Sequence, residues 1–226
     1  MSKTKLQLIL NMAVKFGLGF LIIGFLLFST AGTVKYINAW IYISSMAVLM
    51  LFFGIYLLVK EPETLKRRLL SREPNKEQRV NIILSALFFI LTFILAGLDF
   101  RFKWSTPSVK LVIISLVLMI VGYVIYTIVI LQNTYASRIV KVVEDQKLIS
   151  EGIYSLVRHP LYFSTLLIFI PTPLILGSWY ALIPMVFYPI IIIKRIKEEE
   201  NLLIKELKGY EEYTEKVKYR LIPFIW

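Results

Sequence analysis

The chain has 226 residues, of which 58% are hydrophobic, a mean hydropathy of +0.71 and a net charge of +11 at pH 7. It contains no cysteine and one histidine, His159, which excludes disulfides, thiolate chemistry and any zinc or iron site built from several imidazoles. No metal is therefore expected, and any chemistry must use carboxylates, arginines, tyrosines, one imidazole or a bound organic cofactor.

Four apolar blocks are long enough to cross the hydrocarbon core of a bilayer as helices, which takes roughly 20 residues each. They are residues 6–28, 36–59, 80–98 and 109–131. A fifth apolar region, 161–193, is interrupted at Gly177 and Ser178, and its halves are short for full spans. We therefore predict an all-α polytopic membrane protein with four long transmembrane helices followed by a tight helical hairpin.

The basic residues are divided unevenly between the two sides of the membrane. If successive blocks cross in opposite directions, the two sides carry 21 and 4 lysines and arginines, and Lys15 lies within the first block. This asymmetry predicts that both termini are cytoplasmic. Because topology and contact with anionic headgroups account for the positive charge, nucleic acid is not an expected partner.

Residues 1–131 are interpreted as a membrane scaffold. Ionisable residues, which usually mark intramembrane sites, are nearly absent from its apolar blocks. The charged connection 60–79 is interpreted as an interfacial helix and a topology signal rather than as a catalytic segment.

Residues 132–226 are predicted to carry the chemistry. The polar loop 132–160 is longer than most connections, and such loops are usually functional or disordered. After the hairpin, apolar residues recur at helical spacing among charges, which predicts an amphipathic tail helix along the cytoplasmic surface. These residues are Leu202, Leu203, Leu207, Tyr210, Tyr213 and Val217. The loop and the tail then lie on the same side of the membrane, where they can build one site.

Two motifs flank the hairpin. In "RHPLY", Pro160 suits the first position of a helix and His159 its cap, so the motif alone indicates only a helix start. In "KRIKEEENLL", Arg195 and Glu199 are four residues apart and share one helix face. They can form a surface ion pair worth about 0–1 kcal/mol, or they can orient two ligand groups of opposite charge.

Taken together and in this order, the motifs make residues 146–224 resemble the isoprenylcysteine carboxyl methyltransferases and their phospholipid-methyltransferase relatives. The resembling stretches are "GIYSLVRHPLY", the hairpin, "KEEENLLIKEL", "GYEEYTEKV" and "RLIPF". The resemblance implies an integral-membrane methyltransferase with a pocket for S-adenosylmethionine. That pocket would open to the cytoplasm for the cofactor and to the lipid for a hydrophobic substrate.

The resemblance also implies roles for individual positions. The residues that match the family's cofactor pocket are Gln146, Lys147, Leu148, Ile149, Tyr154, His159, Pro160, Leu161 and Tyr162. Glu199 would meet the charged methionine part of the cofactor, and Arg195 would orient the substrate carboxylate, a role that Lys194 fills in an alternative alignment. Tyr210 stands where the family usually has an acidic residue, a change expected to affect helix packing.

Methyl transfer from a sulfonium is an in-line displacement, and a carboxylate acceptor needs no general base because it is already an anion. Alignment and removal of water should therefore dominate, with His159 as a pocket wall and hydrogen-bond donor to the cofactor. The expected activity is carboxyl O-methylation of a prenylated or lipidic substrate. A phospholipid headgroup amine is the alternative acceptor, and it needs a base, for which Glu198 or Glu200 could serve.

Two further classes stay open at this point. NADPH-dependent membrane sterol or lipid reductases have a similar C-terminal half, including a Tyr-Arg pair as in "KYRLIP". They typically carry an asparagine where this chain has Pro160 and Leu161, and they lack the triple-glutamate run. A non-enzymatic scaffold would bind no cofactor and would tolerate substitution equally at Tyr154, His159 and Glu199.

Overall fold

The computed structural model describes residues 3–69, 76–136, 142 and 146–226, and the regular structure of these residues is helical. The elements are α1 (Lys3–Ala31), α2 (Ile37–Lys60), α3 (Pro62–Arg68), α4 (Lys76–Phe102), α5 (Val109–Gln132), the 3-10 helix η1 (Gly152–Ser155), α6 (Pro160–Phe169), α7 (Thr172–Ile175), α8 (Leu182–Met185), α9 (Tyr188–Glu206) and α10 (Tyr210–Lys216). Helices α1, α2, α4 and α5 are long and apolar enough to cross a membrane, as predicted.

The surface of the bundle is that of an integral membrane protein. Leu21, Phe25, Phe52 and Val109 are each at least 70% exposed, and many other large apolar side chains on the long helices face outward. Soluble proteins rarely expose apolar patches of this extent. The predicted all-α polytopic membrane fold is confirmed.

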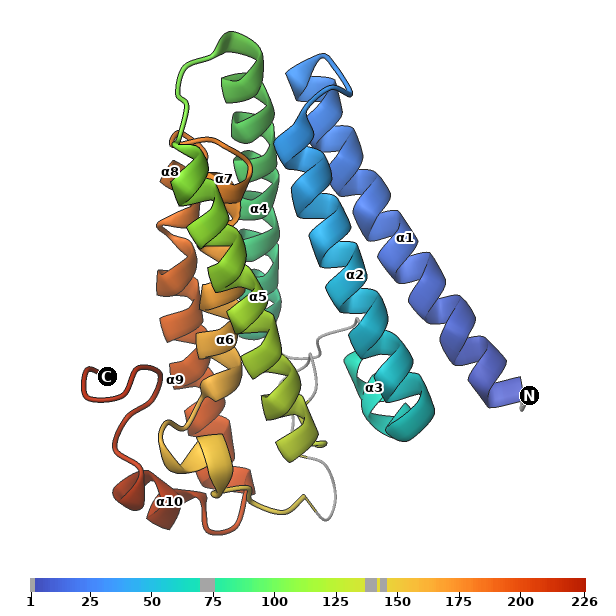
Figure 1. The fold of residues 1–226 in the computed structure, drawn as a ribbon. Coiled ribbons are helices and arrows are strands. Elements are labelled where there is room, and N and C mark those ends of the chain that lie inside the picture. Colours follow the sequence, from blue (N-terminus) through green and yellow to red (C-terminus); the bar gives the residue numbers. More distant parts are fainter. Residues whose placement is uncertain (1–2, 70–75, 137–141, 143–145) are drawn as a thin grey trace.

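The long helices stand side by side (Figure 1). Helices α4, α5, α6 and α9 form one group, and α1 and α2 form a pair beside it, in which α1 packs on both α2 and α4. One end of the bundle carries η1 and α10 and is called the tail end; the other carries the α4–α5 connection, α7 and α8 and is called the far end. Both chain termini lie toward the tail end (Figure 1).

The hairpin predicted after the polar loop is present, with short helices in both arms. Helix α6 ends ahead of Pro171 and Pro173, which lack the backbone N–H that would continue its hydrogen bonding. The chain turns at Gly177, whose φ of +77° suits glycine. The side-chain amide of Asn38 donates to the carbonyl of Ile175 at 2.8 Å, so α2 satisfies a carbonyl at the end of α7.

The tail is helical, but it forms two helices where the apolar spacing predicts one. Helix α9 runs directly out of the hairpin and ends at Glu206, and the chain then turns at Gly209, which has a left-handed φ of +83°. The turn folds the apolar face of the tail onto the polar loop. The side chains that meet there are Leu148, Leu203, Leu207, Tyr210, Tyr213 and Val217.

The charged connection 60–79 contains α3, and residues 70–75, which also belong to the predicted interfacial helix, lie outside the described residues. The ammonium of Lys15, which lies within the first apolar block, donates to the carbonyl of Leu69. This contact joins α1 to the chain just after α3, where a cation is favourable near a helix C-terminus.

Helices α5 and α6 approach each other closely at Gly122. A β-carbon there would lie 2.7 Å from the β-carbon of Leu167 and 3.0 Å from the backbone nitrogen of Ile168. We expect Gly122→Ala to lower the free energy of unfolding by about 1–3 kcal/mol, the usual cost of overpacking. The control is Gly17→Ala, because no atom lies within 4 Å of a β-carbon there. Thermal unfolding in detergent measures the difference, and equal midpoint temperatures for the two variants would contradict this close packing.

Candidate active site

A cavity of about 850 Å³, counting its opening to solvent, lies at the tail end between the loop, α6, α9 and α10. All residues that the resemblance assigns to the cofactor or the substrate line it: Gln146, Lys147, Leu148, Ile149, Tyr154, His159, Pro160, Leu161, Tyr162, Arg195 and Glu199. The fold therefore brings together two motifs that lie on opposite arms of the hairpin.

Contacts from the end of α5 and from α10 hold η1 against this cavity. The hydroxyl of Tyr154 accepts a hydrogen bond from the side-chain amide of Asn133 at 3.2 Å, and the hydroxyl of Tyr213 donates to the Tyr154 carbonyl at 2.6 Å. The backbone N–H of Ile153 donates to the Gln132 side chain at 3.2 Å. Burial raises the pKa of Tyr154 to about 12, so this side chain is a neutral phenol at physiological pH.

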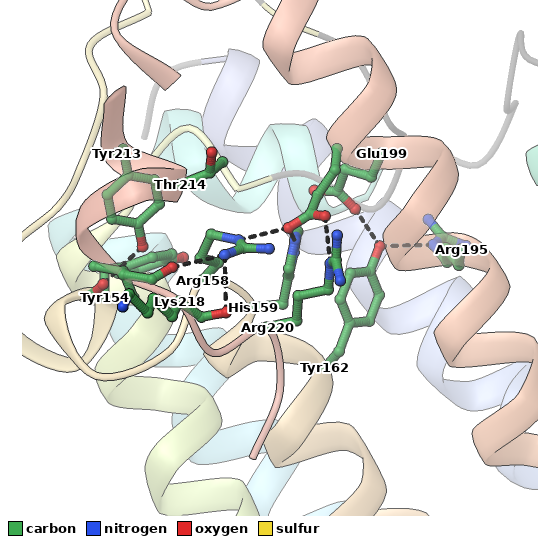
Figure 2. A network of polar contacts seen from close by, with 12 residues as sticks. Tyr154, Arg158, His159, Tyr162, Arg195, Glu199, Tyr213, Thr214, Lys218 and Arg220 are labelled. Atoms are coloured by element: carbon green, nitrogen blue, oxygen red, sulfur yellow. Dashed lines mark hydrogen bonds and ion pairs between the residues drawn. The ribbon is translucent and has the colours of Figure 1, made fainter. Parts of the chain in front are cut away.

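The carboxylate of Glu200 is the centre of a polar network beside the cavity (Figure 2). One oxygen accepts from Nε of Arg158 at 2.6 Å and contacts Nε2 of His159 at 3.2 Å, and the other accepts from Nε of Arg220 at 2.6 Å. Glu200, Arg158 and His159 are all nearly fully buried. Because the partner is a carboxylate, we assign the His159 proton to Nε2. The network joins the loop, α9 and the C-terminal segment.

The C-terminal segment is also fastened to the loop through its backbone. Nη1 of Arg158 donates to the carbonyls of Val217 at 2.6 Å and Lys218 at 3.1 Å. The backbone N–H groups of Arg158 and His159 donate to the carbonyls of Tyr219 at 2.9 Å and Arg220 at 2.8 Å. These contacts, together with Glu200, give the Arg158 guanidinium a structural role.

The network predicts how stability depends on pH. Burial alone raises the pKa of Glu200, but the hydrogen bonds from His159, Arg158 and Arg220 outweigh it and lower the pKa from 4.5 to about 2. A carboxyl whose pKa is lower in the folded chain than in the unfolded chain stabilises the fold above the unfolded pKa. This contribution is lost as the pH falls toward 2.

Glu200→Gln is therefore expected to lower the free energy of unfolding by on the order of 3 kcal/mol near neutral pH. The difference from the parent chain should shrink as the pH falls from about 5 to 2. Thermal unfolding across this pH range measures it, with Glu206→Gln at an exposed position of α9 as the control. A difference that does not change with pH would contradict the assignment.

Arg195 and Glu199 face the cavity from α9, and Tyr162 of α6 lies between them (Figure 2). Nε of Arg195 donates to the Tyr162 hydroxyl at 2.9 Å, and this hydroxyl donates to the Glu199 carboxylate. The predicted proximity of the two motifs is thus a direct contact. The i, i+4 spacing predicts the shared face of Arg195 and Glu199, but it contains no sign of the bridging tyrosine.

A second cavity, of about 1380 Å³ counting the open space at its mouth, adjoins the first, and Leu161, Tyr162 and Arg195 line both. Its walls are mainly apolar residues of α2, α4, α5, α6 and α9, including Met46, Met50, Ile82, Phe89, Ile168, Phe169 and Ile192. Arg68 of α3 also lines it, and its guanidinium donates to the Tyr126 hydroxyl. The sequence interpretation missed Arg68, because its contact joins residues 58 positions apart.

The three consecutive glutamates of α9 point in three directions, as residues about 100° apart on a helix must. Glu198 accepts from the side-chain amides of Gln78 at 2.9 Å and Asn81 at 2.7 Å, both on α4. Lys194, the alternative to Arg195, is largely exposed, lies 3.7 Å from the Glu198 carboxylate and lines neither cavity. Geometry therefore places Arg195, and not Lys194, at the cavity.

Comparisons with known proteins give a match in sequence and a match in structure. The sequence model of the isoprenylcysteine carboxyl methyltransferase (ICMT) family matches residues 112–205. The structure of a eukaryotic intramembrane Ras methyltransferase ICMT matches with a TM-score of 0.55 and 23% sequence identity, over 95% of this chain and 75% of that chain. No curated protein matches the sequence. Residues 112–205 therefore match the isoprenylcysteine carboxyl methyltransferase family in sequence, and most of the chain shares the fold of a solved intramembrane methyltransferase.

Proposed function

We propose that the chain transfers the methyl group of S-adenosylmethionine to the carboxylate of a prenylated or other lipidic substrate. One observation carries the proposal. A polar cavity lined by the positions that match the family's cofactor pocket adjoins an apolar cavity, and Arg195 lines both. The proposed division of labour, with residues 1–131 as scaffold and 132–226 as the reactive region, is part of the same proposal.

The cavity at the tail end suits S-adenosylmethionine by its chemistry. The cofactor carries a sulfonium, an ammonium, a carboxylate and a flat adenine ring. Glu199 supplies a carboxylate for the positive charges, and Leu148, Ile149 and Leu203 supply apolar surface for a ring. One Glu199 oxygen accepts from Tyr162, and the carboxylate has capacity for further donors. When bound, the cofactor supplies an electrophilic methyl group on its sulfonium.

The chain's own residues then bind and orient the reactants. Glu199 holds the charged end of the cofactor, and Arg195 holds the carboxylate acceptor by a charge-assisted hydrogen bond. Tyr162, between the two, fixes their relative positions. A carboxylate acceptor requires no proton removal, so alignment of the acceptor with the methyl group is the main contribution to the rate.

The adjoining apolar cavity favours a substrate with a long hydrocarbon chain. Met46, Met50, Phe89 and Phe169 give it flexible and aromatic walls, which suit an isoprenoid or acyl chain. Arg68, together with Arg195, adds positive charge to this cavity, which favours an anionic head group. A lipid chain in this cavity brings its head group to Arg195, where the two cavities meet.

The contacts of α9 favour a carboxylate acceptor over an amine. An amine acceptor needs a base, and the two glutamates considered for that role are engaged elsewhere. Glu200 accepts hydrogen bonds from three cationic or imidazole side chains, which keeps it ionised and weakly basic. Glu198 contacts α4 and lines neither cavity.

The test is a methyl-transfer assay with the purified chain in lipid nanodiscs and S-adenosylmethionine labelled in its methyl group. Acceptors are a prenylated cysteine with a free carboxylate and, separately, phosphatidylethanolamine. We expect label on the prenylated cysteine that mild base releases as methanol, because the product is an ester. Base-stable label on the phospholipid would contradict the carboxylate assignment. Binding of NADPH instead of S-adenosylmethionine would contradict the methyl-transfer proposal and support a reductase.

A further inference from the structure

A third cavity, of about 1540 Å³ counting the open space at its mouth, lies at the far end of the bundle. Its walls are the α1–α2 connection, the end of α4, the α4–α5 connection, the first turns of α5 and the turn after α7 (Figure 1). It shares no lining residue with either cavity at the tail end. The methyl-transfer proposal gives it no role.

Basic residues gather around this cavity although they are scarce on its side of the membrane. By sequence, that side carries Lys35, Arg101, Lys103 and Lys110, and both Arg101 and Lys103 line the cavity. Among the described residues, no ion pair involves Arg101 or Lys103. The Arg101 guanidinium lies 5.5 Å from the ring centre of Phe102. Two cations are therefore available to a negatively charged ligand.

A carboxylate on the same wall is bonded to neutral groups and not to these cations. Asp99 is fully buried, and its oxygens accept from the backbone N–H of Ser105 at 2.7 Å and from the hydroxyls of Ser105 and Ser178. Ser105 in turn accepts from the backbone N–H of Trp179 at 3.0 Å. These bonds tie the α4–α5 connection to the turn after α7, so the segment that carries Lys103 is held in place.

The remaining walls are apolar. Ile41 of α2 and Val112, Ile113 and Leu116 of α5 line the part of the cavity that extends along the helices into the membrane. At a rise of about 1.5 Å per residue, the α5 residues cover somewhat more than one turn of lipid-facing helix. A ligand that fits must therefore be amphiphilic, with an anionic group at the membrane boundary and a hydrocarbon chain below it.

We propose that the far-end cavity binds an anionic phospholipid from the leaflet opposite the candidate active site. Its phosphate lies at Arg101 and Lys103, and an acyl chain runs along Val112, Ile113 and Leu116 between α2 and α5. Basic residues at a membrane boundary attract anionic lipids, by about fivefold for each residue. The lipid joins the α1–α2 pair to the α4–α5 group at the end remote from the chemistry, and its binding does not depend on the methyl-transfer proposal.

The test is native mass spectrometry of the purified chain with equal amounts of phosphatidylglycerol and phosphatidylcholine of the same chain length. We expect the parent chain to retain phosphatidylglycerol preferentially, and Arg101→Gln and Lys103→Gln each to reduce the retained amount about fivefold. Matched controls are Lys35→Gln and Lys110→Gln, which remove cations from the same side but not from the cavity wall. The controls should retain the lipid as the parent does.

A second variant keeps the test decisive if the charge substitutions disturb folding. Ile113→Trp adds bulk to the apolar wall and leaves both cations in place, and its position is already 55% exposed. We expect it to reduce phosphatidylglycerol retention as strongly as Arg101→Gln. Equal retention of the two lipids by the parent chain would overturn the proposal. So would an equal loss of phosphatidylglycerol from the three cavity variants and from the two lysine controls.

Discussion

Glu199→Gln is expected to weaken the binding of S-adenosylmethionine by about two orders of magnitude while the chain stays folded. The substitution keeps the shape of the side chain and an oxygen for the Tyr162 hydroxyl. It removes the negative charge proposed to hold the cofactor ammonium. Truncating one partner of a desolvated charge pair costs about 2–5 kcal/mol. Equilibrium binding of labelled cofactor to the purified variant measures the effect.

The matched control is Glu206→Gln, seven residues further along the same helix and exposed to solvent. It removes the same charge from α9 and should leave the affinity within about twofold. If the two variants lose affinity equally, the loss arises from the total negative charge of the tail end and not from a contact between Glu199 and the cofactor. Unchanged affinity in Glu199→Gln would remove Glu199 from the proposed cofactor site.

Arg195→Gln is expected to lower kcat/KM for a prenylated carboxylate by about 100-fold and to leave cofactor affinity nearly unchanged. Its guanidinium lines both cavities and is the proposed contact of the substrate carboxylate. Loss of a buried charge-assisted contact is worth about 2–5 kcal/mol. Steady-state kinetics with varied acceptor, together with cofactor binding, separates the two effects.

Lys194→Gln is the control for Arg195, because Lys194 is the neighbouring cation but is largely exposed and lines neither cavity. Its activity should remain within about twofold of the parent. A fall in cofactor affinity as large as the fall in kcat/KM for Arg195→Gln would mean that Arg195 acts through Tyr162 and Glu199 and does not contact the acceptor.

The long helices could be predicted because the thickness of a bilayer sets the length of an apolar span. The four apolar blocks correspond to α1, α2, α4 and α5 with ends that differ by a few residues. The break in the tail has a local signal in Gly209, since glycine after a helix commonly adopts the left-handed conformation. Apolar spacing alone continues through this position and therefore predicts one helix where there are two.

The residues of the cavity could be named from the family resemblance that the ordered motifs carry, but their individual contacts could not. Glu198, Glu199 and Glu200 are equivalent in the sequence and differ only in what each direction of α9 meets. Glu200 has two long-range partners, Arg158 and Arg220. In the sequence both appear as ordinary charges near the membrane. Nothing local distinguishes them, because the contacts arise only when the C-terminal segment folds back onto the loop.

A structure of the chain with S-adenosylhomocysteine, determined in a lipid nanodisc, tests the central claim most directly. The proposal predicts density between residues 146–162 and α9, with the amino-acid part of the ligand against Glu199 and the adenosine part near the loop. It also predicts that His159 and Glu200 stay in contact. Ligand density in another cavity, or a separation of the segment around position 159 from the one around position 199, would contradict the account.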